Sequence, residues 1–528
     1  MNKLSYLPGL LLLLAACSEQ PAEEAATPVI ATSSPATMQA MACEDLAEGE
    51  FALTTISSAQ TVAAGAFVAP AGGFGGFGPD YSGLPAFCRV VGSIHPTSDS
   101  DIRFELWLPV QNWNGRFMQT GNGGVAGNVV HSSMVDPLMR GYAVANTDTG
   151  HPSGGADIYG WAVGHPEKFT DFAWRAVHEL TVTGKAITTA RYGRAPELNY
   201  FVGCSTGGRQ GLMEAQRFPD DYDAIVAGAP AANWSPLMAL ALVIQNNVGE
   251  DKLSLAKLPL LKNAAIAACD ALDGVADQVI SNIAQCTFDP ADLLCEGEAN
   301  AQCLAPEELA AAQTMYAGVV GSDGTVWFPG TGAGSEQLWA PYTSPQFSLG
   351  SAYFKDIIMK DPNWDPATFN ADEHMPPAMD IGAEIIAMDP DISAFLGNGG
   401  KLITYHGTYD GLISYGNTLN YVNDVIATLG EQAFDDGVRY YQIPGMGHCS
   451  GGEGAGDVDW LSAMEAWVEE GNAPGTLMGT HPAPPPGFPG SENALGEFTR
   501  PTCAWPEAPV YNGSGDPMDA ASFSCRAP

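Results

Sequence analysis

Positive charge is scarce in this sequence. Its 528 residues include 21 Lys and Arg against 60 Asp and Glu, which gives a formal net charge of −39. Nucleic acids and anionic lipid surfaces attract proteins through positive patches, so this balance excludes nucleic acid as a partner and disfavours docking onto anionic lipid. Charged residues make up only 15% of the chain and hydrophobic residues 45%. We therefore expect a folded globular protein and not an acidic disordered one.

Long apolar runs are also missing beyond the N-terminus, where Leu10–Ala16 precedes Cys17. The run is typical of an export signal, and the ending LAAC resembles the lipobox of bacterial lipoproteins, in which the cysteine is acylated. We predict a lipoprotein signal peptide at 1–17, a lipid anchor on Cys17 and a flexible tether at 18–42, with cleavage of an ordinary signal near Ala16 as the alternative. The expected location is the bacterial cell envelope, at the outer membrane, in the periplasm or at the cell surface. The anchor would be the only membrane contact.

Short β-rich runs alternate with helical runs over much of the chain, which favours a largely parallel sheet covered on both faces and hence the α/β fold class. Strands are predicted at Arg116–Thr120, Tyr142–Asn146, Tyr200–Val202, Ala224–Ala227, Leu402–Tyr405 and Tyr440–Ile443, and helices at Asp171–Arg191 and Gly208–Phe218. The alternation is lost between about Pro236 and Ala394. We interpret residues 236–395 as an inserted lid domain, and residues 43–235 and 396–528 as the two parts of the core.

The pentapeptide GCSTG at 203–207 matches the pattern G-x-S-x-G and stands between a predicted strand and a predicted helix. A serine on such a turn is thrust out of the sheet, so Ser205 is the candidate nucleophile. The amide of Thr206 can donate to an oxyanion. A second oxyanion amide is expected from Gly123 or Gly124 in an early glycine-rich loop, and the sequence does not choose between them. The alternative for the pentapeptide is a glycine-rich helix N-cap without catalytic function, and the alternative for the early loop is a tight turn without an oxyanion role.

The acid and the base should follow the nucleophile in the order Ser, Asp, His. Asp410 follows one predicted strand and His448 follows the last one, so these residues complete the candidate triad. His406 precedes Asp410 and fits this order poorly; we interpret it as a substrate-binding residue in the pocket wall or, equally, as a core histidine. Cys204 precedes the serine and Cys449 follows the histidine, which predicts a disulfide between them.

Together these residues resemble the tannase and feruloyl esterase family. The likeness runs from about ISSA at 56–59 through WNGRFMQTGNGG at 113–124 and on to Cys525. It implies an α/β-hydrolase core with an inserted lid, and hydrolysis of gallate, hydroxycinnamate and related aromatic carboxylic esters.

The resemblance also organises the eleven cysteines, whose odd number leaves one without an internal partner. It implies five disulfides and leaves Cys17 for lipid. The implied pairs are Cys43–Cys88, Cys204–Cys449, Cys269–Cys286, Cys295–Cys303 and Cys503–Cys525.

Three carboxylates and a glycine lie within DALDGVADQV at 270–279. Oxygen ligands at this spacing suit Ca²⁺, although the pattern is not an EF-hand, and a solvated acidic loop is the alternative. The resemblance implies a structural calcium site that braces the lid. Its implied ligands are the side chains of Asp270, Asp273 and Asp277 and the carbonyls of Val275 and Val279.

Arginine is absent between Arg217 and Arg439, so the whole predicted lid lacks one. A substrate with a free carboxylate would favour a guanidinium partner. We therefore expect a serine esterase for small neutral phenolic esters, such as feruloyl or other hydroxycinnamoyl esters, acting through an acyl-enzyme. The alternatives are a tannin galloyl esterase, a terephthalate-monoester hydrolase and a non-catalytic surface binding protein on a hydrolase scaffold.

Overall fold

The computed structural model describes residues 39–70, 80–152, 158–249, 252–344, 347–483 and 495–527. The predicted signal peptide, its Cys17 and most of the predicted tether lie outside these residues. Within the described part of the chain, no helix is both long and apolar enough to cross a membrane.

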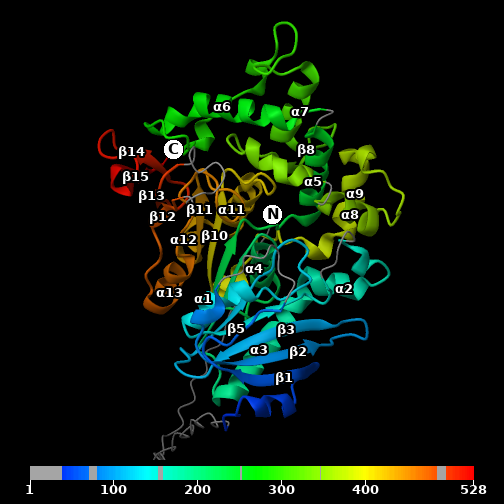
Figure 1. Ribbon diagram of the computed structural model, residues 1–528, viewed down its shortest axis with the longest axis vertical. Helices are drawn as coiled ribbons and strands as arrows, with labels where there is room; N and C mark the ends of the chain where they lie inside the picture. Colours follow the sequence, from blue (N-terminus) through cyan, green and yellow to red (C-terminus); the bar gives the residue numbers. More distant parts are fainter. Residues whose placement is uncertain are drawn as a thin grey trace, which may run out of the picture. The chain divides into compact units, whose positions relative to one another are not determined.

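A nine-stranded mixed sheet in the order β1-β2-β3-β5-β4-β6-β7-β10-β11 forms the centre of the fold (Figure 1). The last six strands of this order, β5-β4-β6-β7-β10-β11, are parallel to one another. They are the six strands predicted above. Strands β1 to β3 pair antiparallel at one edge and were not predicted. The bounds are β1 Thr54–Val62, β2 Phe87–Ile94, β3 Ile102–Pro109, β4 Arg116–Thr120, β5 Ala143–Thr147, β6 Leu198–Cys204, β7 Ala224–Gly228, β10 Lys401–Gly407 and β11 Val438–Ile443.

Helices cover both faces of the sheet, as the alternating pattern predicted. On one face α3, α4 and α11 pack their apolar side chains against alternate strand residues such as Phe201 and Ile225. On the other face α13 packs against the intervening residues, among them Tyr200 and Val226. Burial of each such large side chain contributes about 1.5–3 kcal/mol. The helix bounds are α1 Val135–Met139, α2 Pro166–Thr170, α3 Ala176–Tyr192, α4 Thr206–Arg217, α11 Tyr415–Leu429, α12 Glu431–Gly437 and α13 Trp460–Glu470.

The segment between β7 and β10 adds no strand to the central sheet. Its described residues form six α-helices and a two-stranded ribbon. Five of these helices, α5 to α9, and the ribbon share an apolar cluster with residues from 126 to 173, whereas Phe395 of α10 packs with the core of the central sheet. The bounds are α5 Trp234–Asn247, α6 Leu258–Cys269, α7 Pro306–Ala317, β8 Gly318–Val320, β9 Val326–Pro329, α8 Leu349–Ala352, α9 Ala371–Ile381 and α10 Ser393–Gly397. The domain boundaries at 236 and 395 stay predictions.

Two small antiparallel ribbons end the chain, β12 Leu477–His481 with β13 Phe498–Thr502 and β14 Ala508–Tyr511 with β15 Phe523–Arg526. The Cys503–Cys525 disulfide ties the second ribbon to the end of β13. All five implied disulfides are present. Such a number is typical of proteins that fold in an oxidising compartment, so the chain is an exported protein.

Candidate active site

Ser205 is the one residue between the end of β6 and the start of α4. Its backbone dihedral angles, φ 64° and ψ −121°, belong to a sparsely populated region that costs about 1–3 kcal/mol. Three backbone hydrogen bonds of 3.0 Å hold it there: its N–H donates to the Gly228 carbonyl, and its carbonyl accepts from the N–H groups of Arg209 and Ala231. This is the strand–turn–helix context that a nucleophilic serine of an α/β hydrolase requires.

Two glycines allow the turn to be this tight. A Cβ atom on Gly203 would lie 2.6 Å from the backbone of Gly207, and one on Gly208 would lie 2.2 Å from the Gly228 carbonyl oxygen. Both distances are far below van der Waals contact, so no side chain fits at either position. Gly203 of the pentapeptide and Gly208 directly after it are therefore steric requirements of the turn.

Asp410 is completely buried just after β10. Its Oδ1 accepts the backbone N–H groups of Leu412 and Ile413 at 3.0 and 2.9 Å, and its Oδ2 lies 2.6 Å from His448 Nδ1. Burial by itself would raise the pKa of Asp410. The charge of His448 and the hydrogen bonds from His406 and His448 outweigh that effect and hold the pKa well below its usual value. The carboxylate is therefore ionised at neutral pH.

His448 lies in the turn after β11 and keeps a quarter of its side chain exposed. Burial favours the neutral imidazole, but the adjacent Asp410 carboxylate outweighs it and raises the pKa of His448 above 6.5. Since Oδ2 of ionised Asp410 can only accept, Nδ1 of His448 carries a proton. Nε2 is thereby left as the basic nitrogen, the tautomer that a general base needs.

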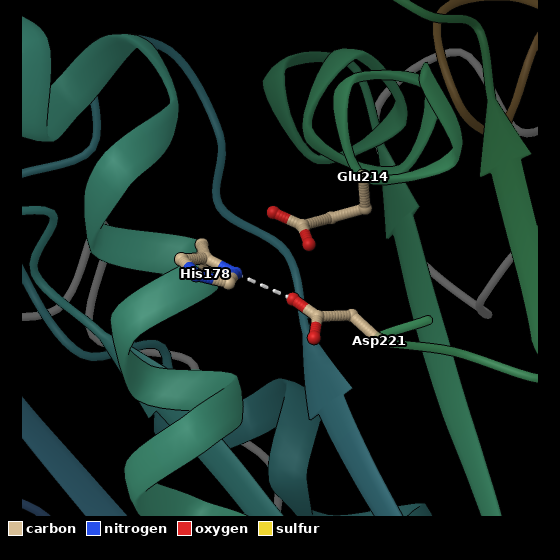
Figure 2. A group of neighbouring side chains, drawn as sticks. All are labelled: His178, Glu214 and Asp221. Carbon is tan, nitrogen blue, oxygen red and sulfur yellow. Dashed lines mark hydrogen bonds and ion pairs between the residues drawn. The ribbon is translucent and has the colours of Figure 1, made fainter. Parts of the chain in front are cut away.

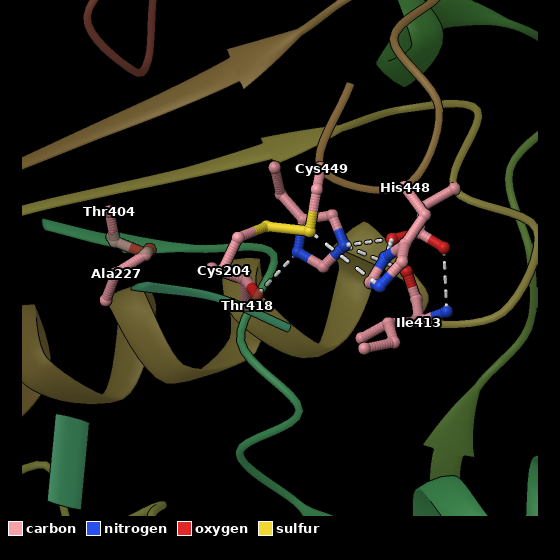
Figure 3. The surroundings of a disulfide bond; sticks show 9 residues. Cys204, Ala227, Thr404, Ile413, Thr418, His448 and Cys449 are labelled. Carbon is pink, nitrogen blue, oxygen red and sulfur yellow. Dashed lines mark hydrogen bonds and ion pairs between the residues drawn. A yellow bond between two sulfur atoms is a disulfide. The ribbon is translucent and has the colours of Figure 1, made fainter. Parts of the chain in front are cut away.

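The Cys204–Cys449 disulfide lies beside His448, the candidate base (Figure 3). Its Cα atoms are 6.0 Å apart across 245 residues of sequence. Cys204 directly precedes Ser205 and Cys449 directly follows His448, so the disulfide limits how far apart these two residues can lie. The Ser205 hydroxyl forms no hydrogen bond with another described residue.

The three predicted oxyanion residues lie together at the start of α4. Thr206 is the first residue of that helix, so its N–H has no acceptor within the helix. Its hydroxyl donates to the Gly124 carbonyl, which joins the helix to the loop after β4. The amides of Gly123 and Gly124 donate to no other backbone carbonyl in the described residues. Both glycines therefore remain candidates for the second donor.

The predicted calcium loop follows α6 and lies between the disulfide partners Cys269 and Cys286. Asp270 accepts the N–H groups of Asp277 and Gln278 at 3.1 and 2.9 Å, and Arg500 of β13 pairs with Asp277. Burial raises the pKa of Asp273 to about 6.

Two features of this loop fit a cation, and one does not. The buried Asp273 Oδ2 has no hydrogen-bond partner, and the carbonyls of Val275 and Val279 accept no backbone hydrogen bond within the described residues. However, the three carboxylates do not form a group whose ligand atoms all lie within 4.8 Å; the one group of that kind in the described chain lies elsewhere. The ligand set therefore stays a prediction.

Comparison with known proteins decides the family. The family model described as tannase and feruloyl esterase matches residues 88–526 of this chain. The chain belongs to the tannase and feruloyl esterase family.

Relatives of this tannase-family esterase align along most of its length. An uncharacterised esterase of Xanthomonas campestris pv. campestris is 34% identical over 539 residues, with 92% of this chain and 91% of the relative covered. Feruloyl esterase C of Talaromyces stipitatus is 33% identical over 466 residues, with 84% and 86% covered.

Solved structures agree with this membership. Feruloyl esterase B from Aspergillus oryzae superposes with a TM-score of 0.83 at 29% identity, covering 92% of this chain and 99% of that one. Tannin acyl hydrolase from Aspergillus niger superposes with a TM-score of 0.72 at 24% identity, covering 90% of this chain and 92% of that one. This likeness shows a shared fold. The predicted α/β-hydrolase core is confirmed, and the tannase-family chain is a carboxylic ester hydrolase.

The placement of His406 in this esterase argues against a substrate-binding role. Its side chain is completely buried, and its Nε2 lies 2.9 Å from the Ile413 carbonyl and 3.3 Å from Asp410 Oδ2. Because the carbonyl can only accept, Nε2 carries the proton, and Nδ1 accepts from the Thr418 hydroxyl at 2.8 Å. Both nitrogens are used inside the protein, so the structure favours the core-histidine interpretation, with His406 holding Asp410 in place.

Asn122 and Gln210 are positioning residues that the sequence did not reveal. Gln210 Oε1 accepts the Asn122 N–H at 3.0 Å, and its Nε2 donates to Asn122 Oδ1 at 3.1 Å. The Asn122 carbonyl in turn accepts the Gly207 N–H at 2.7 Å. These contacts fix the oxyanion loop of the esterase against α4. The two side chains are 88 residues apart and match no short motif, so no sequence signal identified the pair.

Proposed function

We propose that this esterase hydrolyses neutral esters of phenolic acids, such as feruloyl and other hydroxycinnamoyl esters, through an acyl-enzyme on Ser205. The observation that carries the proposal is the 2.6 Å contact between Asp410 and His448, on a histidine that a disulfide holds beside Ser205. The feruloyl esterases among the relatives support the acyl group.

In the proposed reaction, His448 Nε2 takes the hydroxyl proton of Ser205 while the serine oxygen attacks the ester carbonyl carbon. The Thr206 amide and that of Gly123 or Gly124 donate to the oxyanion. His448 then gives its proton to the departing alcohol, and the acyl-enzyme remains. Water, deprotonated by the same nitrogen, attacks the acyl carbon and releases the acid and the serine. Asp410 keeps the proton on His448 Nδ1 throughout.

The segment between β7 and β10 is proposed to serve as a lid that supplies the acyl pocket. Leu338 of this segment lies against the triad turns, because a Cβ on Gly411 would be 2.4 Å from its carbonyl oxygen and one on Gly447 would be 3.3 Å from its side chain. Tyr342 lies one turn further along the chain. Burial raises the pKa of its hydroxyl, and the charge of Asp410 adds a smaller effect, so Tyr342 lies close enough to interact with the triad acid. An aromatic side chain at this place suits a flat phenolic acyl group.

The charge of the lid favours neutral substrates over a terephthalate monoester. The segment has no arginine, and the net charge of −39 repels anions at long range. A galloyl ester is the second candidate, supported by the shared fold with the tannin acyl hydrolase. A purely binding function would have no need of the strained Ser205 turn or of the Asp410–His448 pair.

The test compares methyl ferulate, methyl gallate and a terephthalate monoester on the wild type and on Ser205→Ala. The expected result is fastest hydrolysis of methyl ferulate and loss of at least a thousandfold in kcat/KM in the variant. Ser57→Ala, on edge strand β1, is the matched control and should hydrolyse normally. Unchanged hydrolysis by Ser205→Ala would refute the catalytic assignment, and fastest turnover of the monoester would refute the preference for neutral esters.

We also propose that Ca²⁺ binds the loop at 270–279 and supplies only structural bracing, through Asp270, Asp273 and Asp277 and the carbonyls of Val275 and Val279. The lipid anchor on Cys17 is proposed from its LAAC context. Mass spectrometry of the mature N-terminus tests the anchor: an acylated cysteine is expected, and an unmodified N-terminus near residue 17 would overturn it.

A further inference from the structure

His178, Glu214 and Asp221 form a cluster near the end of α4, whereas Ser205 lies at the start of this helix (Figure 2). His178 lies on the first turn of α3, Glu214 near the end of α4, and Asp221 in the turn that follows α4. One ligand atom from each residue lies within 4.8 Å of the other two. In the described residues this is the one group of three metal-binding side chains that meets this distance.

Glu214 is the unusual member of the cluster. It is 1% exposed, and neither of its carboxylate oxygens has a hydrogen-bond partner. A buried, unpaired carboxylate costs several kcal/mol, so native structures rarely leave one without a compensating group. Figure 2 shows its carboxylate directed toward His178 and Asp221. The side chain is thus aimed at the place where a cation would sit.

The other two side chains are held ready for the same place. His178 Nδ1 lies 2.6 Å from Asp221 Oδ2, and its ring stacks on Phe218 with centroids 3.8 Å apart, which fixes the ring plane. The Asp221 N–H donates to the Phe218 carbonyl at 2.9 Å, so Asp221 is tied to the end of α4. About a quarter of His178 is exposed, which leaves a side open to a water ligand.

The charges around the cluster are unbalanced. Glu214 and Asp221 have Asp220 and Asp223 nearby, and Lys185 of α3 is the cation that interacts with all four. The Lys185 ammonium is itself engaged by the Asp221 carbonyl and does not hydrogen-bond to Glu214. A divalent cation would supply the missing positive charge.

We propose that His178, Glu214 and Asp221 form a binding site for a divalent transition metal of the zinc type, which links α3 to α4. One imidazole nitrogen and two carboxylates are ligands that Zn²⁺ accepts, with water in the fourth position. Zinc–ligand bonds of about 2.0–2.2 Å place neighbouring ligand atoms about 3.3–3.5 Å apart. Zinc binding therefore replaces the hydrogen bond between His178 Nδ1 and Asp221 Oδ2. It requires these two atoms to move apart by less than about 1 Å. The site is structural, since none of its residues belongs to the proposed triad.

The test is titration of the folded full-length protein with Zn²⁺ alone, after removal of bound transition metals by a chelator and return to a Ca²⁺ buffer. One equivalent should bind and raise Tm. His178→Ala should weaken binding at least tenfold, as should Glu214→Gln. Co²⁺ in place of Zn²⁺ should give the visible absorption of a four-coordinate ion, and His178→Ala should lose it.

His165→Ala is the matched control, because His165 forms a similar 2.8 Å pair with Asp99 but has no third carboxylate within reach among the described residues. This variant should bind zinc like the wild type. Equal binding by His178→Ala would overturn the proposal, as would absence of binding by the wild type. If the wild type binds no zinc, a rise in Tm for Glu214→Gln would identify Glu214 as a buried protonated carboxyl group instead of a ligand. Burial raises the pKa of Glu214 well above its usual value, which favours the protonated form.

Discussion

Cys204 and Cys449 are covalently joined with Cα atoms 6.0 Å apart, although 245 positions separate them in the sequence. Each is the immediate neighbour of a proposed catalytic residue. The disulfide therefore constrains the distance between nucleophile and base directly, which distinguishes it from the four disulfides elsewhere in the fold.

Removing this disulfide should impair catalysis as well as stability. We expect the double variant Cys204→Ala/Cys449→Ala to lose at least a hundredfold in kcat/KM and to unfold at a much lower temperature. On the chain-entropy model, closing so long a loop is worth about 5 kcal/mol, against about 2–3 kcal/mol for the Cys295–Cys303 loop of 8 residues. Ester hydrolysis and thermal unfolding measure the two effects.

The control is the double variant Cys295→Ala/Cys303→Ala. It removes a disulfide within the inserted segment and should keep kcat while losing some stability. If both double variants kept the wild-type kcat, the disulfide at the site would have no role in positioning Ser205 and His448.

The activity should depend on pH through His448. Because its pKa is raised above 6.5, and only the neutral form accepts a proton, kcat/KM should rise with pH with an apparent pKa above 6.5. Asp410→Asn should lower that apparent pKa and reduce kcat by about 10³–10⁴-fold, since the correct tautomer is no longer enforced. An unchanged pH profile in this variant would contradict the assigned pair.

The same pair makes stability depend on pH in a defined window. The pKa of Asp410 is lower in the folded protein than its unfolded value of 3.8, so this carboxylate stabilises the fold at pH values above 3.8. The contribution is lost as the pH falls from 3.8 through the folded pKa. The raised pKa of His448 stabilises the fold below 6.5, and this contribution is lost as the pH rises through the folded value. The difference in Tm between wild type and Asp410→Asn should therefore be largest between about pH 4 and 6.5, and thermal unfolding across this range measures it.

The contact between Gln210 and Asn122 should matter for kcat more than for KM. Gln210→Ala removes both hydrogen bonds to Asn122 and releases the oxyanion loop, so we expect kcat to fall about ten- to a hundredfold. Gln216→Ala, on the same helix, is the control, because its side chain contacts Ala387 and Tyr421 instead. Equal kcat values for the two variants would exclude the positioning role.

Removal of calcium should destabilise the protein without changing its chemistry. We expect a chelator to lower Tm by several degrees, and Asp273→Asn to make Tm independent of added Ca²⁺, with kcat retained while the chain is folded. Asp289→Asn is the control, because that aspartate only caps a short helical turn. A wild-type Tm that does not respond to chelator would refute the calcium site.

Local pattern was sufficient for the parallel part of the sheet and for the residues around Ser205. Strands β4, β5, β7 and β10 of that part are short, almost wholly buried runs, and each can be predicted from its own residues. Edge strand β1 was missed because only one of its nine residues is buried, so its apolar alternation is weak. His406 was open to two interpretations because burial, which favours the core interpretation, is a property of the packed chain.

The sequence by itself determined the chemistry and the family: a serine in a strand–helix turn, an acid and a base in order, and paired cysteines beside them. Only the tertiary structure decided which groups face each other. Asn122 with Gln210, and His178 with Glu214 and Asp221, are brought together by helices packing on the sheet. No local spacing encodes these contacts, because they depend on the positions of whole elements and not on neighbouring residues.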